Sequence, residues 1–312
     1  MNTLYFKYAV EVERTRSISK AAKNLVMAQP NLSKAIKELE ESLGFAIFER
    51  TPRGVIPTGK GNIFLDYARN ILSQIDSIHA LSASADKNVQ KFSITVSRGS
   101  YVSNSIVSFV AGLDANMGLE LDIRETSSME VVNNVISGRY NLGVIRYRSG
   151  YEQYYSDYLA QHRIASEKIW EYEFLVITSR RSPLASMPVI VPDDLAGLTE
   201  ILHGDTVIPY LSSSQNDTRN TPVPAKNLIR LYERCNQFEL LSTLPTAFMW
   251  ASPLPDEMLN RYNLVQRRCS FPNNAFKDLL IYPESYSLST LELRFMDELY
   301  ATRDALMGKK FR

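Results

Sequence analysis

Amide, hydroxyl and ammonium side chains follow one another along residues 29–37, and these groups hydrogen-bond readily to nucleic acid. On an α-helix they share one face, opposite an apolar stripe whose members are spaced by four, three and four residues. Amides and hydroxyls can donate to base edges, and lysines bind phosphate oxygens. The polar face carries Gln29, Asn31, Ser33, Lys34 and Lys37, and the stripe carries Leu32, Ile36, Leu39 and Leu43.

Three acids, Glu38, Glu40 and Glu41, stand at the far end of the same predicted helix, where they would repel DNA. A helix face that is only solvated does not predict acids confined to one end. The pattern therefore indicates that the N-terminal half of this helix enters the major groove.

The preceding residues predict the elements that a helix-turn-helix needs to position such a helix. Ser17 is a suitable N-cap for a short second helix, whose Ala21–Ala22 pair would let another helix approach closely. Proline is favoured in a first helical turn, so Pro30 marks the start of the third helix. A first helix is predicted from the apolar stripe of Leu4, Tyr8 and Val12.

A β-wing is predicted directly after Gly44. Residues 45–48 and 55–56 read as two short strands around a turn at residues 51–54. Arg53 at the tip of this turn could reach into an adjacent minor groove. Arg50 is expected to contact phosphate or to pair with a nearby glutamate.

Composition places the chain among ordinary globular proteins. It has 312 residues, 45% hydrophobic and 22% charged, which is enough for two or three domains. No run of about 18 apolar residues or signal-peptide pattern is seen, so we expect no membrane partner and a cytoplasmic location. The net charge of +1 is uneven, because residues 1–91 carry +4 and the remainder −3. A basic N-terminal portion suits a nucleic-acid module.

The segment 21–61 resembles the DNA-binding domain of LysR-type transcriptional regulators. The matching positions are Ala21-Ala22, Gln29-Pro30, Leu32-Ser33, Ile36, Leu39-Glu40, Leu43-Gly44, Ile47-Phe48-Glu49-Arg50, Thr58 and Gly61. The resemblance implies a winged helix-turn-helix that binds an interrupted dyad in double-stranded DNA as a dimer. It further implies a homotetramer built as a dimer of dimers, with RNA polymerase as a possible partner. The expected DNA-binding residues are Ser17, Gln29, Pro30, Asn31, Ser33, Lys34, Lys37, Arg50, Arg53 and Thr58.

Three positions depart from the pattern of this family. Ala28 stands where the family usually has serine, and Arg16 occupies a turn position that favours glycine. Lys34 replaces an arginine that is common in the recognition helix, and lysine cannot make the rigid two-pronged contact of arginine.

A single long helix is predicted over residues 59–88. Apolar residues recur along it at the 3.5-residue spacing of a helix pair, which indicates dimerisation; the alternative is a stripe packed on the chain's own core. The predicted seam consists of Phe64, Ala68, Ile71, Ile75 and Ile78.

Strand and helix signals alternate over residues 92–312, which predicts an α/β domain with mostly parallel strands. Strands are expected at 92–97, 119–125, 141–146, 172–177, 200–202, 248–250 and 278–282. Helices are expected at 102–113, 129–136, 225–234 and 289–307.

The resemblance implies that residues 89–312 form an effector domain of the type 2 periplasmic-binding-protein fold. The overall prediction is an α+β multidomain chain, with a DNA-binding domain at 1–58 and a linker helix at 59–88. Subdomain I would span about 92–165 and 268–312, and subdomain II about 166–267. Asn141 and Gly143 replace the family's usual Asp and Ala, and residues 242–255 lack a Gly-x-Gly turn.

Ligands of such domains bind at the carboxyl ends of strands beside helix N-termini. Three segments follow predicted strands and would form the walls of an effector site. Their hydroxyls and arginines favour a small anionic effector, although these groups could also be simple caps and solvated charges. The expected effector-binding residues are Arg98, Gly99, Ser100, Tyr101, Thr126, Ser127, Ser128, Arg146 and Tyr147.

Nothing in the sequence predicts catalysis, a metal site or a cofactor. The three histidines and two cysteines lack metal-ligand spacing, and no nucleotide-binding or nucleophile motif is present. The favoured function is a ligand-responsive transcriptional regulator. The alternatives are a ligand-independent repressor or architectural protein, and an enzyme or solute-binding domain fused to a DNA-binding head.

Overall fold

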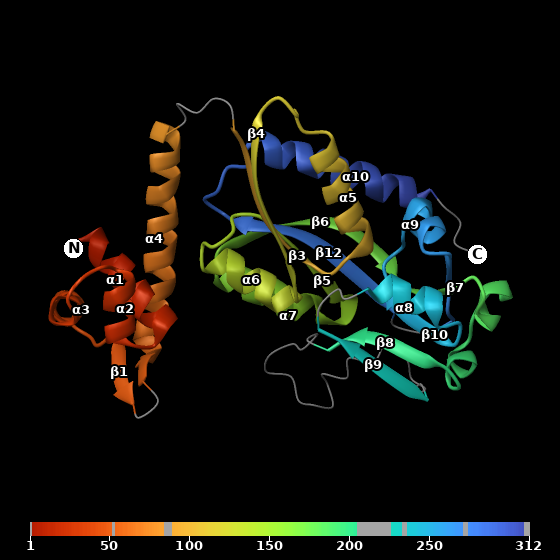
Figure 1. The fold of residues 1–312 in the computed structure, drawn as a ribbon, viewed down its shortest axis with the longest axis horizontal. Helices are drawn as coiled ribbons and strands as arrows, with labels where there is room; N and C mark the ends of the chain where they lie inside the picture. Colours follow the sequence, from red (N-terminus) through yellow and green to blue (C-terminus); the bar gives the residue numbers. More distant parts are fainter. Residues whose placement is uncertain are drawn as a thin grey trace. The chain divides into compact units, whose positions relative to one another are not determined.

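The computed structural model describes residues 2–51, 54–83, 89–204, 226–232, 236–270 and 274–308. The chain forms two compact units, one of residues 1–88 together with 136–140, the other of residues 89–135 and 141–312 (Figure 1). None of the helices in the described ranges is long and apolar enough to cross a membrane.

The N-terminal unit is a helix-turn-helix with a two-stranded wing and a long helix. Its elements are α1 (Thr3–Thr15), α2 (Ile18–Asn24), α3 (Gln29–Leu43), β1 (Phe48–Thr51), β2 (Gly54–Pro57) and α4 (Gly59–Ala83). The Ser17 hydroxyl accepts from the Lys20 N–H and caps α2, as predicted. Ala21 and Ala22 are fully buried, so their small size allows the close helix packing expected of them.

Two predictions for this unit are wrong in detail. Leu4 is 46% exposed, and Phe6 instead lies in the core with Ala9 and Val12, because α1 presents a face rotated from the predicted stripe. The first wing strand begins at Phe48 rather than near residue 45. Its start is fixed by the Glu40 carboxylate, which accepts from the N–H groups of Ile47 and Phe48 at 2.7 and 3.0 Å.

The predicted dimer seam on α4 is partly used inside the domain. Ala68 is 1% exposed, and the Phe64 ring packs edge-on against Phe6 at 5.5 Å between ring centroids. Among the side chains of α4 that the structure describes, the exposed apolar ones are Ile63, Tyr67 and Ile71, at 59%, 67% and 40%. The side chain of Ile78 lies outside the described residues.

The larger unit contains two five-stranded sheets. The first has the order β4-β3-β5-β12-β6, with β3, β4 and β5 parallel and β12 antiparallel to both of its neighbours. Its strands are β3 (Val89–Ser97), β4 (Gly118–Thr126), β5 (Gly143–Arg148), β6 (Ile164–Glu173) and β12 (Ala275–Pro283). Its helices are α5 (Ser100–Ala111), α6 (Ser128–Ile136), α7 (Glu152–Gln161) and α10 (Thr290–Met307), with the short turn η1 (Ser149–Tyr151).

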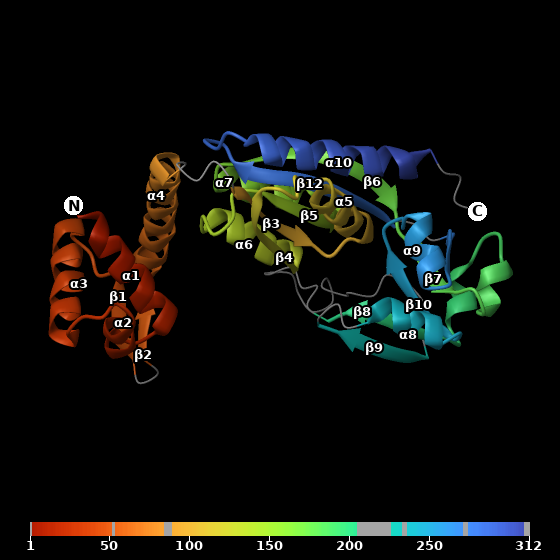
Figure 2. The same ribbon diagram turned by 45° about the horizontal axis from the view of Figure 1, so that its top comes forward.

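Packing around the first sheet explains two local sequence features. Phe109 of α5 and Phe295 of α10 meet Phe92 of β3, so both helices pack on this strand (Figure 2). A Cβ at Gly143 would lie 2.9 Å from Val131 of α6 and 3.0 Å from Ile281 of β12. Glycine at this position therefore lets α6 approach the sheet closely.

The second sheet has the order β11-β7-β10-β8-β9 and mixes parallel and antiparallel pairs. Its strands are β7 (Leu175–Ser179), β8 (Thr199–His203), β9 (Asn227–Leu231), β10 (Ala247–Ala251) and β11 (Leu264–Arg267). The helical elements around it are α8 (Gln237–Thr243), α9 (Asp256–Arg261), η2 (Pro183–Ser186) and η3 (Pro192–Leu195).

Three predictions for the larger unit are corrected. The run 172–177 is not one strand, because β6 ends at Glu173 and β7 begins at Leu175 in the other sheet. The first crossing between sheets therefore lies at Phe174 and not near residue 165. Residues 227–231, predicted as part of a helix, form the strand β9 beside β8. The sheets are also less parallel than expected, since β12 and β7 run antiparallel to their neighbours.

The two crossings between the sheets are bonded to each other. The Phe174 N–H donates to the Asn274 carbonyl at 3.2 Å, and the Asn274 side-chain amide donates to the Phe174 carbonyl at 2.8 Å. The rings of Phe174 and Phe276 stack at 3.6 Å. One buried apolar cluster continues from the first sheet through these residues to Phe248 and Trp250 of the second.

Gly61 and Gly59 offer a test of how tightly α4 is held to the wing. A Cβ at Gly61 would lie 1.9 Å from the Ile47 carbonyl oxygen, whereas a Cβ at Gly59 would meet nothing within 4 Å. We expect Gly61→Ala to lower the free energy of unfolding of the N-terminal domain by about 3 kcal/mol. Gly59→Ala should instead raise it by about 0.5 kcal/mol. Denaturant unfolding followed by helical circular dichroism measures both, and equal effects would contradict the packing described.

Candidate functional site

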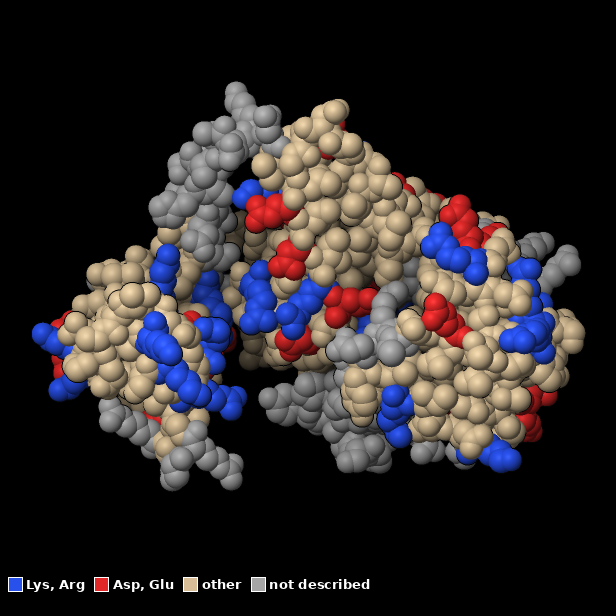
Figure 3. Space-filling model, in the orientation of Figure 1, with Lys and Arg blue, Asp and Glu red and all other residues tan. Residues whose placement is uncertain are grey.

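The polar side chains predicted to meet DNA lie on the outer face of α3. Its apolar stripe is buried in the domain, while Gln29, Asn31, Lys34 and Lys37 are exposed and Ser33 is half-buried. The two lysine side chains are 78% and 77% exposed. Figure 3 shows Lys and Arg side chains over the α2 and α3 region of this unit.

The N-terminus of α3 is open to an anion. Ala28 occupies the N-cap and makes no side-chain hydrogen bond to the helix, and exposed Pro30 lies in the first turn. The absence of a capping hydroxyl leaves the positive end of the helix dipole available to a phosphate oxygen.

The acids of α3 divide into two roles. Glu38 and Glu41 pair with Lys34 and Lys37 across one turn, at 3.8 and 3.7 Å. Exposed pairs of this kind contribute only about 0.3–0.5 kcal/mol, so the lysines can exchange them for phosphate at little cost. Glu40 is turned inward to the wing, which corrects its expected place among the groups that repel DNA.

Other predicted DNA-binding residues serve first as caps. The Ser17 oxygen accepts from the first turn of α2, which leaves its own proton free to donate. The Thr58 hydroxyl donates to the Ala46 carbonyl at 2.7 Å and accepts from the Gly61 N–H, so it joins the wing to α4. Arg53 lies outside the described residues, as does the side chain of Arg50.

Two residues in the turns of the helix-turn-helix adopt a left-handed backbone conformation. Arg16 has φ of 51°, which explains why a glycine suits this position, and Val26 has φ of 53°. A β-branched residue is rarely found in this conformation, and Val26 is also 93% exposed. The sequence pattern did not reveal this strained apolar residue shortly before α3.

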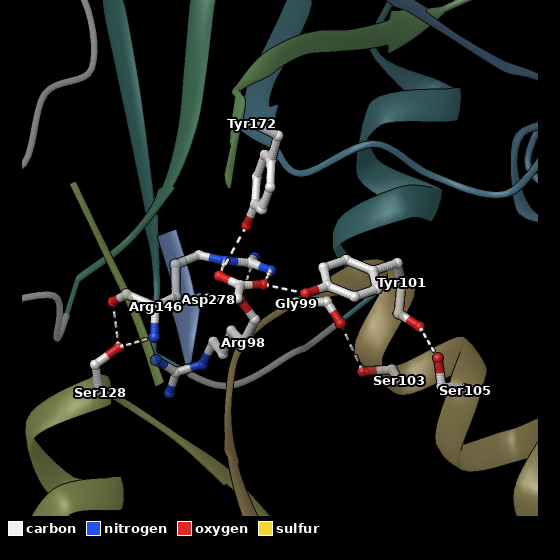
Figure 4. A network of polar contacts seen from close by, with 9 residues as sticks. All are labelled: Arg98, Gly99, Tyr101, Ser103, Ser105, Ser128, Arg146, Tyr172 and Asp278. Atoms are coloured by element: carbon white, nitrogen blue, oxygen red, sulfur yellow. Dashed lines mark hydrogen bonds and ion pairs between the residues drawn. The ribbon is translucent and has the colours of Figure 1, made fainter. Parts of the chain in front are cut away.

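In the larger unit, the arginine expected to bind a ligand is committed to an internal carboxylate. Arg146 of β5 donates to Asp278 of β12 through Nε at 2.8 Å and Nη2 at 2.6 Å (Figure 4). The hydroxyls of Tyr101 and Tyr172 donate to the same carboxylate at 2.5 and 3.0 Å. Asp278 is completely buried, and the Arg146 side chain is 9% exposed.

This arrangement corrects the expectation that Arg146, Tyr101 and Tyr147 face an effector. Tyr101 is fully buried beneath the network. Tyr147 is 5% exposed and stacks on Tyr155 of α7 at 4.5 Å, so it belongs to the core. Asp278 and Tyr172 were missed by sequence reasoning, although a single acid in the apolar run of β12 is an identifiable signal.

The other predicted effector residues lie at the carboxyl ends of β3 and β4. The Ser128 hydroxyl bonds to both the N–H and the carbonyl of Arg146, and the Ser127 hydroxyl caps α6 through the Glu130 N–H. Arg98 donates to the Tyr232 carbonyl at 2.8 Å and so links the two sheets.

Gly99 lies directly against the guanidinium. A Cβ at Gly99 would lie 2.6 Å from Arg146 Nη2. Thr126 is half-buried, and the side chain of Ser100 lies outside the described residues. Glycine therefore gives Arg146 room to reach Asp278.

The ionisation of the network follows from its burial. Burial raises the pKa of Tyr101 and Tyr172 well above the usual tyrosine value, and the Asp278 carboxylate adds to this effect. Burial alone would lower the pKa of Arg146, but the attraction of Asp278 outweighs it and the pKa is raised. Both tyrosines therefore remain hydrogen-bond donors and the arginine remains charged at neutral pH.

Redox and metal chemistry find no support in the described residues. Burial, together with Asp194, raises the pKa of the Cys269 thiol to about 11, so this thiol is a weak nucleophile. Cys235 lies outside the described residues. Where the structure describes side chains, it shows no group of three His, Cys, Asp or Glu residues that could hold a metal ion.

Comparison with known proteins connects the N-terminal unit to a single family. The family model described as "Bacterial regulatory helix-turn-helix protein, lysR family" matches residues 5–62. The regulator BenM of Acinetobacter baylyi is 38% identical over 93 residues, 29% of this chain and 31% of that protein. AlsR of Bacillus subtilis is 29% identical over 146 residues, 46% of this chain and 48% of that protein. The chain thus spans about a third to a half of the length of these relatives.

Solved structures share the fold of the whole chain. Full-length OxyR from Pseudomonas aeruginosa is 16% identical with a TM-score of 0.58, covering 97% of this chain and 94% of that one. The LysR family regulator CbnR is 15% identical with a TM-score of 0.54, covering 97% and 99%. The resemblance predicted from residues 21–61 and the predicted fold class are both confirmed.

Stability at alkaline pH tests the buried tyrosines. Tyrosine in an unfolded chain ionises near pH 10, whereas Tyr101 and Tyr172 stay protonated in the fold. Above pH 10 the folded state therefore binds more protons, and stability falls as pH rises. We expect the Tm to decline between pH 9 and 11, and Tyr172→Phe to make this decline shallower. Tyr232→Phe, at a 61% exposed position, should leave it unchanged; an equal effect of both variants would refute the assignment.

Proposed function

We propose that this chain, whose N-terminal domain belongs to the lysR family of bacterial regulatory helix-turn-helix proteins, is a sequence-specific transcriptional regulator that reads double-stranded DNA with α3. The observation that carries the proposal is the exposed face of α3, where amide, hydroxyl and lysine groups stand on a helix whose other side is buried. One solved neighbour is full-length CbnR in complex with its target DNA; that chain is 16% identical with a TM-score of 0.53.

Each group on the proposed reading surface has its own role. Gln29, Asn31 and Ser33 meet base edges, and Lys34 and Lys37 meet phosphates or guanine. Pro30 sets the start of the helix, and a phosphate binds near its N-terminus. Ser17, Arg50 and Thr58 contact the backbone around the groove, and Arg53 in the wing enters the minor groove.

The chain acts as a pair in this proposal, so its target is an interrupted dyad. Ile63, Tyr67 and Ile71 form an exposed apolar stripe on α4 with a spacing of four residues. This stripe replaces Phe64 and Ala68 as the start of the seam, which continues through Ile75 and Ile78. The proposal also includes a homotetramer built from two such pairs and contact with RNA polymerase. It places the chain in the cytoplasm.

Control by a small molecule bound between the sheets is the usual arrangement implied by this fold. Thr126, Ser127, Arg98 and Gly99 remain candidates to bind such an effector. The specific alternative is a regulator that needs no ligand, and one observation favours it: the arginine best placed to bind an anion already holds Asp278. An enzymatic function is not proposed, since the relatives are transcriptional regulators.

Substitutions on α3 separate the recognition of bases from sequence-independent electrostatic attraction to DNA. We expect Ser33→Ala and Lys34→Ala to reduce the preference for the target over a mismatched site about tenfold, the loss of one base contact. Glu41→Gln is the matched control on the same face. It frees Lys37 from its partner at 3.7 Å, so it should tighten binding to all DNA and leave the preference intact. Competition binding to target and mismatched duplexes measures both, and an unchanged preference in both alanine variants would contradict the role of α3.

The wing is tested by salt dependence. Arg53→Ala should weaken binding evenly across sequences, and the slope of log affinity against log salt should fall by about 1, as for one lost phosphate contact. Titrations of the full chain from low to physiological salt measure this slope. A variant that changes only the response to small molecules would show that Arg53 does not lie at the DNA.

A further inference from the structure

The carboxylate of Asp278 is bound as a free ligand would be bound. Its four hydrogen bonds come from one guanidinium and two phenols, two on each oxygen. Nη1 of the same guanidinium donates to the Arg98 carbonyl at 2.9 Å. A two-pronged arginine contact completed by two hydroxyls is the arrangement that recognises a planar carboxylate.

The Asp278 carboxylate lies at the edge of the sheet where a ligand would be expected to bind. It lies beside the carboxyl ends of the parallel strands β3 and β5 and the start of α5, the edge where ligands bind in open α/β sheets. The side chain reaches this edge from β12, whose pairing with β6 is irregular between Asp278 and Leu279. Bulges of this kind re-aim a side chain next to functional sites.

Aromatic rings surround the pair and exclude water. The guanidinium carbon lies 5.4–5.8 Å from the ring centroids of Tyr101, Tyr172 and Phe174. Tyr172 and Phe174 lead into the first crossing between the sheets, and Asp278 follows closely after the second. The carboxylate thus bonds the outgoing and returning segments of the chain beside the two crossings between the sheets.

We propose that Asp278 is a built-in ligand: its carboxylate occupies a small-carboxylate site formed by Arg146, Tyr101 and Tyr172, and holds the effector domain in its ligand-bound arrangement without a free anion. The effect of the Asp278 carboxylate on DNA binding rests on the proposed function, whereas the existence of the small-carboxylate site does not. Free carboxylates cannot enter the native site, because the Asp278 carboxylate already fills it and takes both hydroxyls and the two-pronged contact of Arg146. Removal of the Asp278 carboxyl group alone would create a vacant site for formate.

The test is rescue of the full-length chain by formate. Asp278→Ala removes one carboxyl group and leaves a space of the size of formate. We expect its Tm to be well below that of the native chain in chloride. Formate at five times its dissociation constant should raise the Tm by about 2–4 °C relative to chloride at equal ionic strength.

Two control variants make the rescue specific. Asp278→Asn fills the same space without charge. We expect this variant to be less stable than the native chain, and formate to raise its Tm no more than it raises the Tm of the native chain. Asp278→Ala combined with Arg146→Met should lose the response as well. If Asp278→Ala does not fold in chloride, the yield of folded protein after refolding in formate against chloride gives the same comparison.

A DNA footprint separates this inference from the proposed function. The native footprint should not respond to formate, and that of Asp278→Ala should differ in chloride and return to the native pattern in formate. Absence of any specific footprint from the native chain would overturn the proposed function and leave the thermal result standing. The built-in ligand is refuted if formate stabilises Asp278→Ala no more than Asp278→Asn, or if formate stabilises the native chain in a manner that depends on Arg146.

Discussion

A buried carboxylate that water does not reach must obtain its hydrogen bonds from the chain, and Asp278 imposes this requirement on the larger unit. Burial of an unpaired charge costs several kcal/mol, and only a complete set of donors offsets it. Arg146, Tyr101 and Tyr172 supply that set from β5, α5 and β6. Gly99 must lack a side chain so that the guanidinium fits. The positions of these three elements relative to β12 are therefore fixed together.

A different constraint organises the N-terminal domain. The wing, α3 and α4 meet through a small number of directional contacts, in which Glu40 binds two wing N–H groups and Thr58 joins the wing to α4. Gly61 lets the wing backbone approach the helix. These bonds turn the Glu40 carboxylate inward and use the Thr58 hydroxyl within the domain. The groups that remain outward on the first half of α3 are those that suit DNA, so the proposed reading surface follows from the packing.

Sequence patterns predicted the local elements best where one residue type dominates a face. The helices and wing of the first 58 residues, and most strands of the larger unit, follow from periodicity and from caps such as Ser17. The break at Phe174 could not be predicted, because Tyr172 and Leu175 on either side both suit a strand and only the pairing with Asn274 reveals it. Strand β9 was mistaken for a helix, since its short apolar run fits both periods and β8 decides between them. Arg146 was expected to end its strand, but β5 continues to Arg148. Its partner is 132 residues away, and spacing cannot show such a pair.

The central claim is that this chain reads DNA in pairs through α3, and selection of bound sequences from a random DNA pool tests it most directly. The full-length protein is mixed with the pool, and the bound fragments are sequenced. The account predicts an inverted repeat of two short half-sites separated by a spacer, as a pair of helix-turn-helix domains requires. Enrichment of a single undivided motif, or of no motif at all, would contradict it.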